Sequence, residues 1–594
     1  MGTSSEVKTA LGTRHLPSKS GDYLTEETAI HPSYPLYATR KRHCCHGSDG
    51  FTVISVCFFV LTSAITFALI IQIHYGSPEV TPHGAVATDG EKCSHIGIKI
   101  MQEGGSAVDV AIASLLCMTV IHPHVIGPGG SGVMLVHDHK SNQSVVIDFM
   151  SDIPSSHKSE VPLQQDTGGR SIGVPGLLRG LEYAHSKYGK VPWSSLFTPS
   201  IELAREGFNV SAHLEQSLKR LNVTQVDGIT PFEKTFFPRG LMLKEGDFLK
   251  RENYADLLET ISINGAESFY ALDFGVEELK ALRAAGSDIH VRDFENYKVR
   301  ERSCIHMTME DYTVITAPAP FGGPQLLLAL EMLRNSNLTQ ASPALLYHSF
   351  IEAIRRSYRS FVELAVVEEP SLENVTQQLL KSNFNTSIDS TITPADPTVL
   401  AISDQAATTV SVIDTFDQYV AAVAGLGSFF GSRLMTEHGI LFNNHLSNLP
   451  NSPLPEKDEF SRVRPLSLYT PVILTDYKQV CGERVVLSSP EVGAAAQIIS
   501  QLIIRQKNLI DAIAQPRLTV KPGVDEVYRE DFGEGAKMPA DATNSLKAMN
   551  HSFEVLHQPY ASVNGISKIK DNLVSMSDIR GGGVAHRLES SPKT

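Results

Sequence analysis

The stretch Ala406-Ala407-Thr408-Thr409-Val410-Ser411-Val412-Ile413, followed by Tyr419-Val420-Ala421-Ala422-Val423-Ala424-Gly425, decides the fold of this chain. Both runs are apolar and rich in β-branched residues, and a polar loop with two aspartates separates them. This pattern predicts two central strands joined as a hairpin. The chain then continues through Phe429-Phe430-Gly431-Ser432 to Gly439-Ile440-Leu441-Phe442-Asn443-Asn444.

Composition and charge argue against a disordered protein and against a nucleic-acid-binding protein. The chain has 594 residues, of which 42% are hydrophobic, so it is long enough for a large multilayer domain and is not typical of a disordered protein. Its formal net charge is −14, which gives no basic footprint for nucleic acid. We therefore expect no nucleic-acid partner.

A single long apolar segment lies near the N-terminus. Residues 51–71 contain no charged side chain, and as a helix they extend about 30 Å, enough to cross a bilayer. Residues 40–42 (Arg-Lys-Arg) precede the segment, whereas Pro78 and Glu79 follow it. The positive-inside rule therefore predicts a cytoplasmic tail at residues 1–50, a transmembrane signal anchor at 51–71 and a type II protein whose ectodomain is extracellular or lumenal.

Glycosylation signals agree with that orientation. Seven Asn-x-Ser/Thr sequons occur, and all of them follow the apolar segment. The predicted acceptors are Asn142, Asn209, Asn222, Asn337, Asn374, Asn385 and Asn550.

The seven cysteines divide in the same way. Cys44 and Cys45 lie beside the membrane, as palmitoylation sites or as solvated thiols, and Cys57 lies within the span. The four cysteines of the ectodomain are an even number in an oxidising compartment, which permits two disulfides. They are Cys93, Cys117, Cys304 and Cys481.

The start of the ectodomain has the pattern of a buried strand followed by buried helices. Residues 84–89 are apolar up to Thr88 and Asp89, which is typical of a first strand. Ser106-Ala107-Val108-Asp109 resembles a capping box and predicts the start of a helix that runs to about Thr119.

Several short landmarks occur in the order found in the gamma-glutamyltransferases, also called glutathione hydrolases, and the chain resembles that family over roughly residues 80–590. The landmarks are Gly127–Gly132, Gly173–Gly176, Asp293–Tyr297, Pro318–Gly323, Glu352–Tyr358, Ala407–Val412, Phe429–Ser432, Pro465–Ser467 and Asp578–Gly582. The tail and the anchor are similar to a membrane-anchored branch of this family.

The resemblance implies a mixed α/β (α+β) fold, the N-terminal-nucleophile hydrolase sandwich. Its four αββα layers would place two antiparallel sheets between helices, after one transmembrane helix. It also implies a large-subunit-like part at residues 80–406 and a small-subunit-like part at 407–594. The family has a disulfide that corresponds to Cys93–Cys117. Cys304 and Cys481 then remain, either as a second disulfide or as two buried thiols.

The resemblance places the catalytic residue of the family at Ala407. The family reads Thr-Thr-His-x-Ser-Val where this chain reads Ala407-Thr408-Thr409-Val410-Ser411-Val412. In the family the first threonine attacks the γ-glutamyl carbonyl, and its own α-amine, freed by self-cleavage, takes the proton. A methyl group can do neither. A register slip of one residue would make Thr408 the candidate nucleophile, but strand alternation turns Thr408 to the other face unless a bulge intervenes.

The positions that bind substrate in the family also differ here. The arginine for the α-carboxylate falls on Met150, and the two acidic residues for the α-ammonium fall on His445 and Asn448. Of the paired serines only Ser467 remains. A buried site needs opposite charges to offset the desolvation of a charged head group, so these changes indicate weakened binding of a γ-glutamyl group.

The residues at the oxyanion position do not show whether catalysis is lost. The Gly-Gly pair of the family falls on Ala494 and Ala495. Backbone amides survive such a change, although a left-handed conformation would not tolerate it.

Three functions follow from these patterns. The family activity is cleavage of the γ-glutamyl bond of glutathione and its conjugates, with transfer to water or to amino-acid and peptide acceptors. The first alternative is a catalytically inactive, uncleaved ectodomain that binds a partner. The second is a changed specificity in which His445 and Ser467 serve a substrate without a free α-amino-acid head. We expect no cofactor and no metal, since His122-Pro123-His124 is more typical of a turn than of a metal site.

Overall fold

The computed structural model has two parts, residues 1–78 and residues 79–594. The first contains helix α1 (Gly50–Tyr75), whose residues Gly50–Gln72 have a mean hydropathy of 2.5 and are long and apolar enough to cross a membrane. The predicted anchor lies within this helix, whereas residues 1–48 lie outside the described residues. The structure describes residues 49–75, 83–157, 167–221, 230–336, 338–360, 364, 369–381, 388, 393–395, 406–449, 464–479, 482–531 and 537–588.

The quoted stretch forms the two inner strands of a seven-stranded sheet, as predicted. The strand order is β18-β1-β9-β10-β2-β3-β6, and every neighbouring pair is antiparallel. The strands are β1 (Ala85–Thr88), β2 (Ser131–Asp138), β3 (Gln143–Phe149), β6 (Arg300–Arg302), β9 (Ala406–Ile413), β10 (Gln418–Gly427) and β18 (His586–Arg587).

A second sheet has six antiparallel strands in the order β17-β16-β12-β11-β8-β7. They are β7 (Ile305–Met309), β8 (Tyr312–Thr316), β11 (Thr470–Asp476), β12 (Arg484–Ser489), β16 (Asn564–Ile569) and β17 (Asn572–Met576). Two small sheets are formed by β4 (Phe208–Asn209) with β5 (Phe248–Leu249), and by β13 (Leu518–Val520), β14 (Val527–Glu530) and β15 (Phe553–Leu556).

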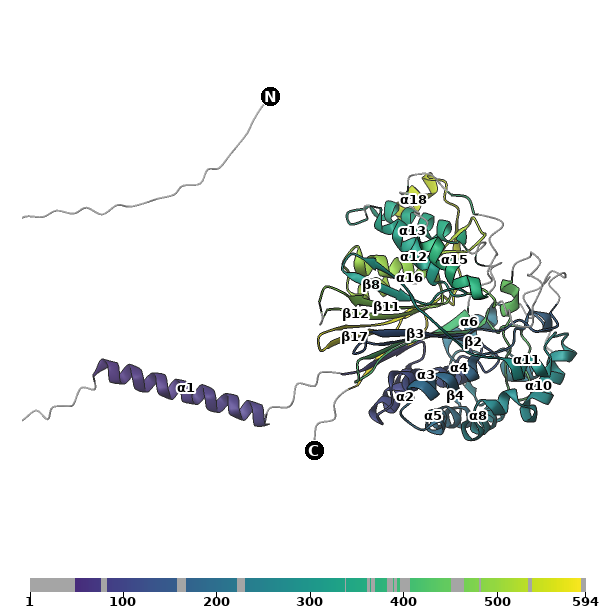
Figure 1. Ribbon diagram of the computed structural model, residues 1–594, viewed down its shortest axis with the longest axis horizontal. Coiled ribbons are helices and arrows are strands. Elements are labelled where there is room, and N and C mark those ends of the chain that lie inside the picture. The colour runs from purple at the N-terminus through teal and green to yellow at the C-terminus, as the bar shows by residue number, and fades with distance from the viewer. Residues whose placement is uncertain are drawn as a thin grey trace, which may run out of the picture. The chain divides into compact units, whose positions relative to one another are not determined.

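Helices cover the outer face of each sheet, so the predicted four-layer αββα sandwich is confirmed (Figure 1). The layer on the seven-stranded sheet contains α2 (Glu91–Gln102), α3 (Ala107–Ile121), α4 (Leu177–Tyr188), α5 (Trp193–Glu206), α6 (Ala212–Lys219), α7 (Pro231–Phe236), α8 (Glu252–Asn264), α9 (Glu267–Tyr270), α10 (Leu272–Ala284) and α11 (Val291–Asn296). The layer on the six-stranded sheet contains α12 (Gly323–Arg334), α13 (Pro343–Ser357), α15 (Glu369–Lys381), α16 (Val492–Ile503), α17 (Leu509–Ala514) and α18 (Ala540–Ala548).

Side chains on the two faces of β9 and β10 pack into two different hydrophobic cores. Val410 and Val412 pack into the core beneath α2 and α3, whereas Ala421 and Val423 of β10 pack into the core between the sheets. Because successive side chains on a strand point to opposite faces, an apolar run buried on both faces belongs at the centre of such a sandwich.

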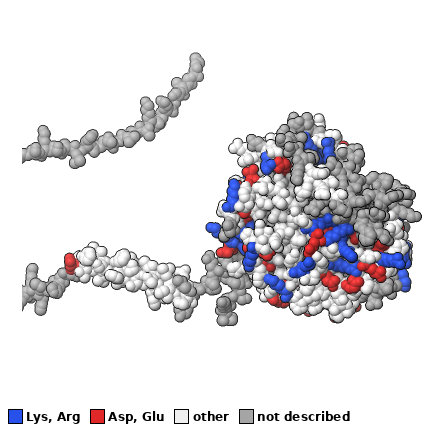
Figure 2. Space-filling view, viewed as in Figure 1, with Lys and Arg blue, Asp and Glu red and all other residues white. Residues whose placement is uncertain are grey.

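The surface of the second part carries charges of both signs. Figure 2 shows Lys and Arg side chains interspersed with Asp and Glu on its visible face. On this face neither sign of charge excludes the other, in keeping with a sequence that has 51 Lys and Arg and 65 Asp and Glu.

Candidate functional site

Ala407 is the second residue of β9 and points toward the space between the two sheets. Its methyl group packs against the inter-sheet core, and its register partner is Gly425 of β10. Ser411, on the same side of the strand, lies 2.9 Å from Ser488 of the second sheet, oxygen to oxygen. The position at which the resemblance places the nucleophile is therefore occupied by a side chain without a hydroxyl.

Thr408 lies on the opposite side of β9. Its Oγ1 donates a hydrogen bond to Asp89 Oδ2 at 2.8 Å, and its side chain shares the strand face of Val410. A bulge does occur nearby, but it lies in β10, where the register shifts between Gly425 and Gly427. Since the bulge is not in β9, it leaves Thr408 on the face that simple alternation predicts.

Asp89 is the residue of this site that the sequence did not single out. Besides the Thr408 hydroxyl it accepts hydrogen bonds from the Thr409 amide at 2.9 Å, Ser562 Oγ at 2.6 Å and Asn564 Nδ2 at 2.7 Å. Burial raises the pKa of this carboxyl, although the hydrogen bonds that it accepts act in the opposite direction. An aspartate directly after a fully buried strand was the signal that could have identified it.

A small cavity of about 40 Å³ opens at this end of β9. Ala407, Thr408 and Asp89 all line it. A neighbouring cavity of about 490 Å³ shares residues with it, so the two adjoin. The shared lining consists of Asp89, His122, His213, Pro559 and Tyr560.

Burial keeps the imidazole rings of these cavities neutral. It lowers the pKa of His122 to about 4 and that of His213 well below its usual value. His124, the other histidine of the His-Pro-His sequence, lies with its Nε2 2.7 Å from His213 Nδ1.

His445 and Asn448, to which the resemblance assigns the acidic positions of the family, begin and end a short 3₁₀ turn, His445–Asn448. His445 Nδ1 lies 2.8 Å from Ser151 Oγ, and burial lowers the pKa of this histidine to about 3. Its Nε2 has no hydrogen-bond partner among the described residues. Asn448 Nδ2 donates to the Leu466 carbonyl at 3.3 Å. Where the resemblance places two negative charges, this chain has a neutral imidazole and an amide.

Ser467 is buried against the landmark Pro318–Gly323. Its amide donates to the Pro320 carbonyl at 2.8 Å, and its Oγ accepts from the Tyr469 amide at 3.2 Å. The serine that resembles the family pair thus shapes a turn.

Met150 is fully buried in the core between the sheets. An arginine does lie near the residues that flank it, since Arg464 bonds to Asp148 at 2.5 Å and to Asp152 at 3.0 Å. Burial alone would raise the pKa of Asp148, but Arg464 and Arg302 hold it at about 2. These two carboxylates neutralise Arg464, so its charge is already paired within the protein.

Ala494 and Ala495 lie in the first turn of α16 and are buried. The Ala495 amide donates to the Glu491 carbonyl at 3.3 Å. Because both residues are helical, their positions do not need the left-handed conformation that favours glycine.

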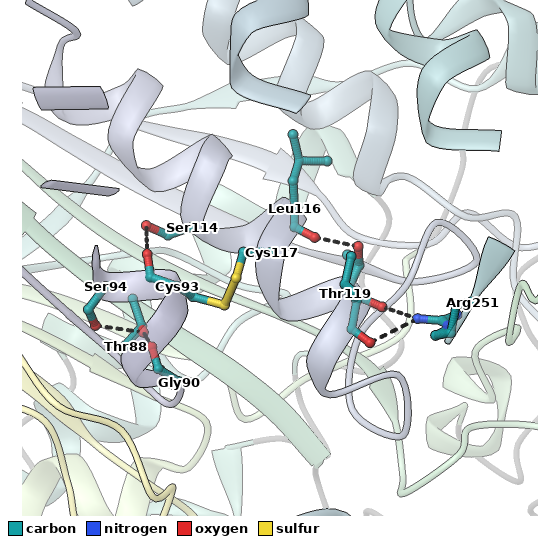
Figure 3. The surroundings of a disulfide bond; sticks show 10 residues. Thr88, Gly90, Cys93, Ser94, Ser114, Leu116, Cys117, Thr119 and Arg251 are labelled. Atoms are coloured by element: carbon teal, nitrogen blue, oxygen red, sulfur yellow. Dashed lines mark hydrogen bonds between the residues drawn. A yellow bond between two sulfur atoms is a disulfide. The ribbon is translucent and has the colours of Figure 1, made fainter. Parts of the chain in front are cut away.

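The predicted disulfide is confirmed. Cys93 of α2 and Cys117 of α3 are joined, with their Cα atoms 5.3 Å apart (Figure 3). Helix α3 begins as predicted, since Ser106 and Asp109 form a capping box at its start. Cys304 carries a free thiol. Its other suggested state, a disulfide with Cys481, concerns a residue outside the described ones.

Four of the seven predicted acceptor asparagines are described, and each is exposed. They are Asn142, Asn209, Asn374 and Asn550, whereas Asn222, Asn337 and Asn385 lie outside the described residues. Exposure is what attachment of a glycan requires, so the four remain predicted sites.

Comparisons with known proteins agree with the sequence landmarks. Residues 93–588 match the family model described as Gamma-glutamyltranspeptidase. Glutathione hydrolase 7 of Homo sapiens is 31% identical over 542 residues, which cover 85% of this chain and 80% of that protein. Glutathione hydrolase 5 proenzyme of Rattus norvegicus is 29% identical over 557 residues, covering 88% and 96%. The family expected from the sequence landmarks is confirmed.

Solved structures show the same architecture. Cephalosporin acylase from Bacillus halodurans superimposes with a TM-score of 0.71 at 21% identity, over 86% of this chain and 96% of that one. A structure titled LmbA2991T421A gives a TM-score of 0.70 at 16% identity, over 85% and 98%. At these identities the likeness concerns the fold alone.

Proposed function

Because this chain belongs to the gamma-glutamyltranspeptidase family and has a methyl group at the nucleophile position, we propose that its ectodomain is an unprocessed, ligand-binding glycoprotein that does not turn over glutathione. One observation carries this proposal. The hydroxyl of the adjacent Thr408 lies on the other side of β9 from Ala407 and is held there by Asp89. Without self-cleavage before Ala407, its nitrogen stays an amide and cannot act as a base.

The positions at which the resemblance places the charged contacts support a ligand without a free α-amino-acid head. A γ-glutamyl group brings a carboxylate and an ammonium, and each charge needs an opposite charge in a buried site. Met150 and the neutral His445 offer none. Losing charged contacts of about 1.5–3 kcal/mol each removes a large part of a micromolar affinity, which is about 8 kcal/mol.

A second candidate function is hydrolysis of glutathione through Thr408. The hydrogen bond of 2.8 Å to Asp89, whose pKa burial raises, is the observation that favours it. In that reaction Oγ1 attacks the γ-glutamyl carbonyl while the Asp89 carboxylate takes the hydroxyl proton. The amine then leaves with that proton, and water releases glutamate.

We place the chain in the membrane as a single-pass type II protein. The support is helix α1 with the basic residues 40–42 before it, and the exposed asparagines of sequons after it. The ectodomain would then be extracellular or lumenal. The large-subunit-like part (80–406) and the small-subunit-like part (407–594) would then stay joined in one uncleaved chain.

Glutamate release from glutathione by the full-length chain in detergent tests the two functions. Our proposal expects the wild type to release no more glutamate than Thr408→Val. Turnover by the wild type that disappears in Thr408→Val and persists in Thr408→Ser would establish the second candidate. Serine keeps the hydroxyl and valine keeps the shape of threonine. The two variants therefore distinguish a role of the hydroxyl as nucleophile from a role of the side chain in packing.

A further inference from the structure

A cluster of two imidazoles and one carboxylate lies in the outer helical layer, away from β9. His348 and Glu352 are one turn apart on α13, so their side chains share one face of that helix. His551 follows α18 and reaches the same place. One ligand atom from each residue lies within 4.8 Å of the other two, and His348 Nδ1 is 2.8 Å from His551 Nε2.

All three side chains are buried, with exposed fractions of 1% for His348, 0% for Glu352 and 5% for His551. A buried carboxylate normally satisfies both of its oxygens. Glu352 Oε2 accepts a hydrogen bond from the Thr393 amide at 2.9 Å. Oε1, by contrast, accepts none within the described part of the chain.

Two arginines form ion pairs with this carboxylate but donate no hydrogen bond to it among the described residues. Arg355 Nη1 and Arg356 Nε are each 3.6 Å from a Glu352 oxygen, longer than a hydrogen bond. Both donate to residue Thr393 instead, Arg355 to its carbonyl and Arg356 to its hydroxyl, at 2.9 Å in each case. Oε1 is therefore a buried carboxylate oxygen without a hydrogen-bond donor among the described residues, on a residue that clusters with two imidazoles.

We propose that His348, Glu352 and His551 bind a structural divalent metal ion, with zinc as the best match. Imidazole nitrogen suits zinc, and two histidines with one glutamate are an established set of three protein ligands, with water in the fourth position of a tetrahedral zinc ion. The ligand atoms would be His348 Nδ1, His551 Nε2 and Glu352 Oε1. Nitrogens bound to tetrahedral zinc are about 3.3–3.4 Å apart, so the two rings need to separate by only about 0.5 Å.

The position of the site suggests what the ion would hold together. His348 and Glu352 lie on α13, whereas His551 lies 199 residues later than Glu352 in sequence, after α18. Through Oε2 the same glutamate holds Thr393, in the segment that leads toward β9. A metal ion would therefore join α13 to the C-terminal region and fix the carboxylate that anchors this segment.

Zinc binding by the full-length chain in detergent tests the proposal. The protein is stripped with a chelator, titrated with Zn²⁺ alone and analysed by mass spectrometry for bound metal. We expect one zinc per chain and a Kd that rises at least about 100-fold in His551→Gln and in Glu352→Gln. Zinc should also raise the Tm of the wild type and leave that of His551→Gln unchanged.

Two control variants match the chemistry of the cluster. His438→Gln removes a histidine whose Nδ1 lies 2.8 Å from Glu278 Oε1, and His213→Gln removes one partner of the His124 contact. Both should bind zinc as the wild type does. A stripped wild type that takes up no stoichiometric zinc would overturn the proposal whether or not the variants fold. Loss of binding in His213→Gln with retention in His551→Gln would overturn it as well.

Discussion

The Thr408 hydroxyl donates a hydrogen bond of 2.8 Å to Asp89 Oδ2, on the side of β9 that faces away from Ala407. Ala407, where the resemblance places the nucleophile, and the hydroxyl of the adjacent Thr408 thus lie on opposite faces of one strand. The same aspartate accepts from the Thr409 amide and from Ser562 and Asn564, so it joins three segments that are distant in sequence. In this arrangement Thr408 stabilises the fold.

Replacing Thr408 by Val should therefore destabilise the protein. Valine keeps the shape but leaves one lone pair of a buried carboxylate unpaired, which costs about 1–3 kcal/mol. Urea unfolding of the full-length chain in detergent measures the change. Thr408→Ser keeps the hydrogen bond and should remain close to the wild type, and equal stability of Thr408→Val and the wild type would contradict this role.

Placing a threonine at residue 407 should not create a glutathione hydrolase. Ala407→Thr supplies a hydroxyl on the inter-sheet side, but Met150 and the neutral His445 still offer no charge to the α-carboxylate and α-ammonium of the substrate. We expect glutamate release to stay at the level of Thr408→Val. Recovery of turnover by this single change would show that the nucleophile is the only missing part.

The disulfide between α2 and α3 should contribute strongly to stability. Closing a loop with a sequence separation of 24 residues is worth about 3 kcal/mol in the chain-entropy account. Cys93→Ala should lower the urea midpoint accordingly, whereas Cys304→Ala, at a free thiol, should change it less. If both variants have the same urea midpoint as the wild type, the disulfide does not stabilise the fold.

Acid should destabilise the protein through His445. Burial lowers its folded pKa to about 3, against an ordinary value near 6.5 for the unfolded chain. The unfolded state therefore binds the proton first, and the stabilisation present above pH 6.5 is lost as the pH falls from about 6.5 toward 3. Between pH 7 and pH 5 this loss is about 2 kcal/mol.

His445→Gln removes that titration and should show a smaller loss of unfolding free energy between pH 7 and pH 5. His95→Gln, at an exposed histidine, is the control and should follow the wild type. An identical pH dependence in His445→Gln and the wild type would refute the assignment.

The four-layer fold was expected from the family resemblance, whereas local sequence patterns predicted only individual elements. The β-branched runs of β9 and β10 predicted paired strands, and the capping residue Ser106 predicted the start of α3. The pairing of Cys93 with Cys117 came from the resemblance. The order of strands in the two sheets could not be read from local patterns, because it depends on contacts between distant segments.

The site was only partly predictable. Alternation along β9 assigns Ala407 and Thr408 to opposite faces, and the contacts of the two side chains agree with that assignment. Asp89 could not be assigned to Thr408, because more than 300 residues separate them in sequence. The cluster of His348, Glu352 and His551 was missed for the same reason, since only the first two share a helix.

Intact mass of the deglycosylated, reduced full-length chain, with N-terminal sequencing of every fragment, tests the central claim most directly. The account predicts one unbroken chain, because Ala407 has no hydroxyl with which to start self-cleavage. A second fragment that begins at Thr408 would contradict it, since such a fragment would carry a freed threonine amine and the means for catalysis.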